Sequence, residues 1–129
     1  MLSFDVLDFT GVCTAQACDF RDEFTELRSQ DAKVFGISTD SHHSHKVFRA
    51  MHNIPYPLLS DWNRKMCKAY GVLYDRFGDY EGVSKRSVFV LDKTCVVRYM
   101  WVMEDAKVRP DVKAVVHEIA TLAGARAGA

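Results

Sequence analysis

The residues best suited to chemistry lie in one short segment near the start of the chain, where Thr10 precedes Cys13 and Cys18 follows it. An alternating apolar pattern precedes this segment and a helical pattern follows it, so Cys13 falls at a junction between a strand and a helix. Unpaired backbone N–H groups and the helix dipole favour negative charge there, which predicts a lowered pKa and a reactive thiolate for Cys13. The Thr10 hydroxyl group is placed to donate a hydrogen bond to that thiolate. The pattern indicates a nucleophilic cysteine with a second thiol nearby.

Packing roles are the alternative for these side chains. A cysteine without further context is more often a small buried apolar residue, and a threonine before a helix is more often a cap. Cys18 equally suits the apolar side of a helix. Cys67 and Cys95 have no neighbouring signature, and we expect both to be structural or incidental thiols.

The elements that position this segment alternate along the chain. Periodicity predicts strands at residues 1–7, 33–38, 58–59, 87–92 and 96–102. It predicts helices at residues 13–29, 42–53, 60–71 and 111–123. This order indicates an α/β fold with a mixed sheet in one domain, residues 1–123, followed by a disordered tail at residues 124–129.

Composition narrows the class of protein. The 129 residues include 17 basic and 17 acidic side chains, so the formal net charge is zero. No overall positive electrostatic field therefore favours nucleic acid or an anionic membrane as a partner. No apolar stretch has the length of a membrane span, and no signal-peptide pattern follows Met1. We therefore expect a cytoplasmic protein whose four cysteines are reactive or packed thiols rather than a disulfide framework.

Several further segments carry a resemblance to a known family. They are Gly36-Ile-Ser-Thr-Asp-Ser41, Pro57-Leu-Leu-Ser-Asp61, Tyr70-Gly-Val72 and Lys85-Arg-Ser-Val-Phe-Val-Leu-Asp92, in order after the cysteine segment. Together they resemble the peroxiredoxins, in the thiol peroxidase group of bacterioferritin comigratory protein and its AhpE-like relatives. The match runs from Met1 to about Ala123.

The resemblance implies a thioredoxin-like fold, with a central mixed sheet flanked by helices, and a peroxidatic cysteine at Cys13. It assigns the family's active-site threonine to Thr10 and its arginine to Arg86. A fixed guanidinium group beside the sulfur would stabilise both the thiolate and the oxygen that leaves the peroxide. The implied substrates are hydrogen peroxide and organic hydroperoxides, with a thioredoxin-like dithiol as reductant and no cofactor.

Cys18 is implied as the thiol that reduces the oxidised Cys13, as in relatives with this spacing. In an intact helix, residues five apart are separated by about 7.5 Å along the axis and about 140° around it. A disulfide needs Cα atoms within about 7 Å and converging side chains. The helix must therefore unwind before Cys13 and Cys18 join, and a one-cysteine mechanism stays open.

The chain departs from the family at three places. Val6 replaces the proline that shields the thiolate, and Gln16 replaces a frequent glutamate. Relatives also carry a further N-terminal segment, so we expect a truncated form of the fold with an exposed sheet flank. Such a surface favours association, which leaves a monomer or a homodimer open.

The same residues also suit other functions. The histidines His42, His43 and His45 do not share one helix face, and with His52 they give no metal-binding pattern, so we expect no metal. A general thiol–disulfide oxidoreductase is one alternative, although such proteins use a shorter cysteine spacing. A chaperone or redox sensor without enzymatic activity is another, because Val6 alters the pocket.

Overall fold

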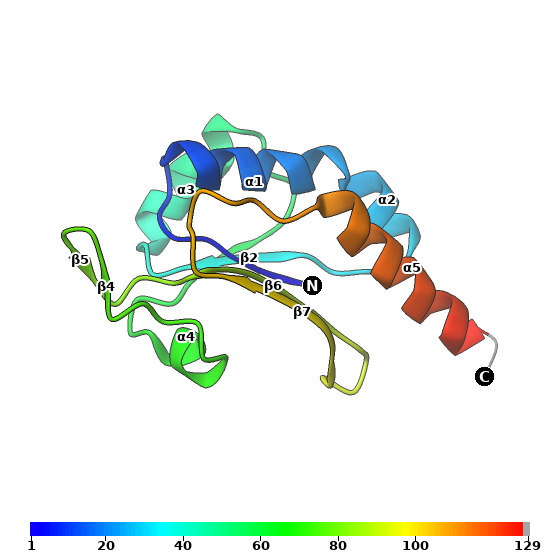
Figure 1. Cartoon of the computed structure of the whole chain (residues 1–129). Helices are drawn as coiled ribbons and strands as arrows, with labels where there is room; N and C mark the ends of the chain where they lie inside the picture. The colour runs from blue at the N-terminus through cyan, green and yellow to red at the C-terminus, as the bar shows by residue number, and fades with distance from the viewer. Residues whose placement is uncertain (128–129) are drawn as a thin grey trace.

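A five-stranded sheet, in the order β3-β2-β1-β6-β7, organises the chain in the computed structural model, which describes residues 1–127 (Figure 1). The strands are β1 (Leu2–Phe4), β2 (Phe35–Ser38), β3 (Leu58–Ser60), β6 (Arg86–Leu91) and β7 (Val97–Met103). β1, β2 and β3 are parallel, whereas β6 is antiparallel to both β1 and β7. The expected mixed sheet is confirmed.

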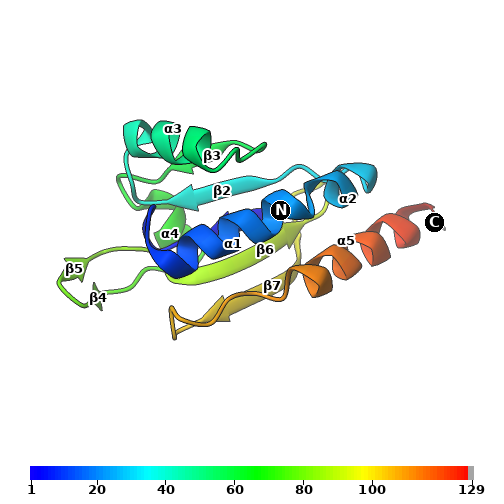
Figure 2. The ribbon, with the colours of Figure 1, turned by 90° about the horizontal axis from the view of Figure 1, so that it is seen from above.

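Helices cover both faces of this sheet (Figures 1 and 2). They are α1 (Gly11–Asp22), α2 (Phe24–Ser29), α3 (His42–Met51), α4 (Lys65–Ala69) and α5 (Val112–Ala127). α1, α2 and α5 lie on one face, and α4 lies on the opposite face. A small hairpin, β4 (Arg76–Phe77) and β5 (Tyr80–Glu81), projects beyond the sheet and was absent from the expected elements. Within residues 1–127 we find no helix with the length and apolar character needed to cross a bilayer.

All four expected helices differ from their expected bounds, and α3 differs least because it ends at Met51 rather than at residue 53. The run expected at residues 13–29 starts earlier, at Gly11, and is broken at Glu23, while the apolar period continues across the break through the buried Phe20 and Leu27. α4 starts later than expected because the Asp61 carboxylate instead accepts hydrogen bonds from the backbone N–H groups that open the helix. α5 continues to Ala127, beyond the expected end at residue 123; the rest of the expected tail, residues 128–129, lies outside the described residues.

The core is divided between the two faces of the sheet. Val88 and Val90 of β6 pack with Phe20 and Val115 under α1 and α5. On the other face, Phe89 forms a second buried cluster that includes Cys67 of α4. β7 is an edge strand, and its Met100, which is paired with Phe89, is 64% exposed. The α4 face is therefore incompletely covered at its β7 edge.

Candidate active site

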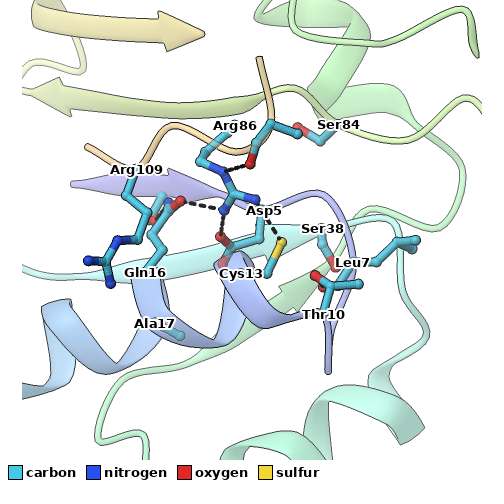
Figure 3. Close-up of polar contacts among 12 residues, drawn as sticks. Asp5, Leu7, Thr10, Cys13, Gln16, Ala17, Ser38, Ser84, Arg86 and Arg109 are labelled. Carbon is cyan, nitrogen blue, oxygen red and sulfur yellow. Dashed lines mark hydrogen bonds and ion pairs between the residues drawn. The ribbon is translucent and has the colours of Figure 1, made fainter. Parts of the chain in front are cut away.

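Cys13 lies in the first turn of α1, and its side chain is only 1% exposed. Val6, Tyr74 and Val83 form a buried apolar cluster with it. Figure 3 shows the sulfur pointing from α1 toward the guanidinium group of Arg86, which reaches it from β6. Val6 thus fills space beside the sulfur, at the position where the resemblance to the peroxiredoxins implies a proline.

The guanidinium group of Arg86 is the centre of the site. It is 2% exposed, and its Nη2 atom donates to Cys13 Sγ at 3.3 Å. Its Nη1 atom donates to Gln16 Oε1 at 2.8 Å and to Asp5 Oδ1 at 3.4 Å, and its Nε atom donates to the Ala106 carbonyl group at 2.9 Å. These bonds fix the plane of the guanidinium group, so one N–H edge faces the sulfur. The predicted pairing of Arg86 with Cys13 is present in the structure.

Gln16 holds the arginine from the next turn of α1. Its side chain is fully buried, and its Nε2 atom donates to Ser3 Oγ at 2.8 Å. That bond orients the amide so that Oε1 is left to accept from Arg86. Because Gln16 is neutral, it orients the cation without neutralising it.

Asp5 is the site residue that the sequence analysis missed. It follows β1, and its side chain is 12% exposed beside Arg86. Burial raises the pKa of its carboxyl group from 3.8 to about 7, against the opposing charge of Arg86. An acidic residue between the buried Phe4 and Val6 was the available signal, because such residues are rarely buried without a partner.

The ionisation of Cys13 differs from the expectation. Burial raises the pKa of its thiol above the ordinary 9.0, and the negative charge of Asp5 adds to that effect. Arg86, the Thr10 hydroxyl group and the Leu7 backbone act in the opposite direction without cancelling it. The prediction of a lowered pKa was therefore wrong for this arrangement, because it considered the helix terminus and neither the enclosing side chains nor Asp5.

Thr10 is the residue immediately before α1, as predicted, and it is exposed. Its hydroxyl group donates to the Leu7 carbonyl group at 2.8 Å, so its hydrogen bond goes to the loop rather than to the sulfur. The hydroxyl group still lies close enough to Cys13 to favour the thiolate. Rotation of the hydroxyl group would direct its hydrogen bond to the Cys13 sulfur instead of the Leu7 carbonyl group.

All four cysteines are free thiols. Cys18 is partly buried on the intact α1, so the helical separation from Cys13 applies. Cys67 is buried under the opposite face of the sheet, where burial raises its pKa to about 12. Cys95 is exposed in the turn between β6 and β7. The structure places neither of these two thiols at the site.

The histidine run has a structural role at one position. His45 is buried, and its Nδ1 atom lies 2.7 Å from Asp8 Oδ2 while its Nε2 atom lies 3.1 Å from the Leu59 carbonyl oxygen. Asp8, Asp40 and His45 lie close enough together to resemble a metal site. Both imidazole nitrogens, however, face protein acceptors, which suits a protonated ring in an ion pair.

Comparisons with known proteins agree with this geometry. The family model described as "AhpC/TSA family" matches residues 1–100. A curated relative named putative peroxiredoxin bcp, from Coxiella burnetii, is 39% identical over 104 residues, which cover 78% of this chain and 68% of the relative. Peroxiredoxin Q of Arabidopsis thaliana, named as chloroplastic, is 43% identical over 101 residues, 78% of this chain and 45% of its own length.

Solved structures show the same fold. Bacterioferritin comigratory protein of Xanthomonas campestris superposes with a TM-score of 0.82 at 28% identity, over 95% of this chain and 78% of that one. AhpC of Mycobacterium tuberculosis superposes with a TM-score of 0.80 at 31% identity, over 94% and 67%. The chain thus spans 67% to 78% of the length of these bacterial proteins and 45% of the plant relative.

Proposed function

Since the chain belongs to the AhpC/TSA family and has the thioredoxin-like fold of the peroxiredoxins, we propose that it is a thiol-dependent peroxidase with Cys13 as its nucleophile. The observation that carries this proposal is the contact between Arg86 Nη2 and Cys13 Sγ, both of them buried. A buried cation aimed at a sulfur stabilises a thiolate and the negative charge that develops beside it.

The chemistry follows from this pair. The Cys13 thiolate attacks one oxygen of the hydroperoxide, an S–O bond forms, and the O–O bond breaks. Cys13 becomes a sulfenic acid, and the leaving oxygen takes a proton to become water or an alcohol. Arg86 faces the reacting sulfur and stabilises charge on the leaving oxygen. The proposed substrates are hydrogen peroxide and organic hydroperoxides.

Recycling is a second part of the proposal. Cys18 attacks the sulfenic acid, water leaves, and a Cys13–Cys18 disulfide forms. A thioredoxin-like dithiol then reduces the disulfide. The support for this step is the presence of Cys18 on the same helix, and its requirement is local unwinding of α1. A cytoplasmic location and a monomeric or homodimeric state also belong to the proposal, and cell fractionation and sedimentation would test them.

The direct test is peroxide consumption coupled to thioredoxin and its reductase. We expect turnover for the wild type and for Cys67→Ser, a buried cysteine outside the site, and none for Cys13→Ser. Insulin reduction is measured alongside, because activity there without peroxide turnover would favour a general thiol–disulfide oxidoreductase. Equal peroxide consumption by the wild type and Cys13→Ser would exclude the peroxidase.

A further inference from the structure

Asp5 and Cys13 are two acids that share one buried cation. Arg86 donates to Asp5 Oδ1 through Nη1 and to Cys13 Sγ through Nη2. The Asp5 backbone N–H donates to the Ile37 carbonyl group at 2.8 Å, which anchors the Asp5 main chain at this end of the sheet. The two acids therefore contact the same guanidinium group through different nitrogen atoms (Figure 3).

The charges around Asp5 make Arg86 the deciding partner. His45 of α3 also acts on Asp5 as a positive charge, but its ring is bound to Asp8. Asp8 and Asp40 act in the opposite sense and favour the neutral carboxyl group. The titratable and charged groups that interact with Asp5 electrostatically are Arg86, Cys13, Asp8, Asp40, His45 and Tyr56.

One positive charge neutralises one negative charge, so the two acids compete. When Asp5 is ionised, a thiolate at Cys13 would place a second negative charge on the same guanidinium group. When Asp5 is protonated, the charge of Arg86 is left for the sulfur. Two acids coupled in this way lose their protons in steps that belong to the pair rather than to either residue.

We propose that Asp5 is a positioning residue for the peroxidase reaction, one that competes with Cys13 for Arg86, so that its protonation state sets how much Cys13 thiolate is present near neutral pH. The inference rests on the proposed function of the site, but the competition itself is a property of the reduced protein. It is testable without any peroxide.

The first experiment measures the rate at which iodoacetamide alkylates Cys13 as a function of pH, resolved by mass spectrometry of the Cys13 peptide. Asp5→Asn removes the competing charge and keeps the shape of the side chain. The alkylation rate rises with pH as Cys13 ionises, and we expect this rise to occur at lower pH in Asp5→Asn. At the pH where the rise begins, alkylation should be about tenfold faster than in the wild type. Asp5→Glu keeps the carboxyl group, and we expect its alkylation rate to have the same pH dependence as the wild type.

Asp61→Asn is the matched control, because Asp61 is a buried aspartate that binds backbone N–H groups of α4 and lies outside the site. We expect it to leave the alkylation profile in place. A uniform change in rate at every pH for Asp5→Asn would assign Asp5 a structural role only, and an unchanged profile would show that no competition exists. Either result overturns the proposal.

A reciprocal measurement does not depend on the folding of an Asp5 variant. Coupling between two sites is mutual, so removal of the Cys13 thiol must change the titration of Asp5. We expect the NMR signal of the Asp5 carboxyl carbon to show a second step in the wild type, at the pH where Cys13 ionises, and no such step in Cys13→Ser. Identical titrations would overturn the inference, whereas peroxidase assays alone decide the proposed function.

Discussion

Arg86 Nη2 lies 3.3 Å from Cys13 Sγ, although 73 positions separate the two residues in the chain. The antiparallel register that pairs Phe4 of β1 with Ser87 of β6 brings Asp5 and Arg86 together at the end of these strands. α1 then starts close by and turns Cys13 toward the same point. Three elements thus meet at one guanidinium group, and the sheet register determines the geometry of the site.

Substitution of Arg86 by lysine tests whether the fork of the guanidinium group matters beyond its charge. A single ammonium group cannot face Cys13, Gln16 and the Ala106 carbonyl group in the directions that Arg86 does. We expect Arg86→Lys to slow sulfenic acid formation about 10²-fold, a magnitude typical for loss of one preorganised donor. Rapid-quench mass spectrometry of the Cys13 peptide measures this rate.

Arg109→Lys is the control for that experiment. Arg109 is half-exposed and pairs with Asp19, and it does not donate to the sulfur in this structure. We expect its rate to match the wild type. Equal losses in the two variants would mean that the slower reaction is not specific to the hydrogen-bond geometry of Arg86.

Oxidation is expected to reduce the helix content of the protein. α1 is intact from Gly11 to Asp22, and the Cys13–Cys18 disulfide does not fit such a helix. Tyr56 donates to the Ala17 carbonyl group at 2.9 Å, so unwinding between the cysteines also disturbs a buried tyrosine. Peroxide treatment should therefore lower the far-ultraviolet circular dichroism of the wild type and change its tyrosine absorbance.

Cys18→Ser separates this effect from oxidation itself. The variant can reach the sulfenic acid at Cys13 but cannot form the disulfide, so we expect its helix signal to stay constant. A disulfide in the wild type with no loss of helix signal would contradict the prediction.

The local parts of the site were predictable and the tertiary parts were not. The segment from Thr10 to Cys18 has a local signature, and the family resemblance located Arg86. The role of Asp5 depends on the β1–β6 register, which no local pattern encodes. The predicted direction of the Cys13 pKa shift was wrong for the same reason. The groups that bury the thiol, and the charge of Asp5, act from outside the helix. Likewise, the break at Glu23 lies within an uninterrupted apolar period.

Cys95 is a position where substitution should stabilise the fold. Its φ of 64° lies in the left-handed region, in the turn between β6 and β7. That conformation costs a residue with a side chain about 1–2 kcal/mol, and glycine avoids this cost at the expense of some added chain entropy. We expect Cys95→Gly to raise the free energy of unfolding by about 0.5–1 kcal/mol in urea titrations. Val96→Gly, next to it but without a positive φ, should lower it.

His45 should make stability depend on pH. Burial by itself lowers the pKa of His45, but the hydrogen bond and charge of Asp8, with the charge of Asp40, raise it above the ordinary 6.5. When folding raises the pKa of a histidine, its full contribution to stability is present at any pH below the pKa that it has in the unfolded chain. That contribution is lost as the pH rises through the folded pKa.

Asp5 also titrates near neutral pH, but it does so in both His45→Gln and His43→Gln. The difference in stability between these two variants therefore isolates the contribution of His45. His43 lies exposed on the same helix. At about pH 6 we expect His45→Gln to be less stable by about 3 kcal/mol, the scale for breaking a buried ion pair. The difference between the two variants should shrink as the pH rises from about 6.5 through the folded pKa of His45. In that range the unfolded chain has lost the His45 proton, so keeping the imidazolium in the folded protein stabilises it less and less. Urea titrations across this range measure it, and a difference that grows with pH would show that His45 is neutral in the folded protein.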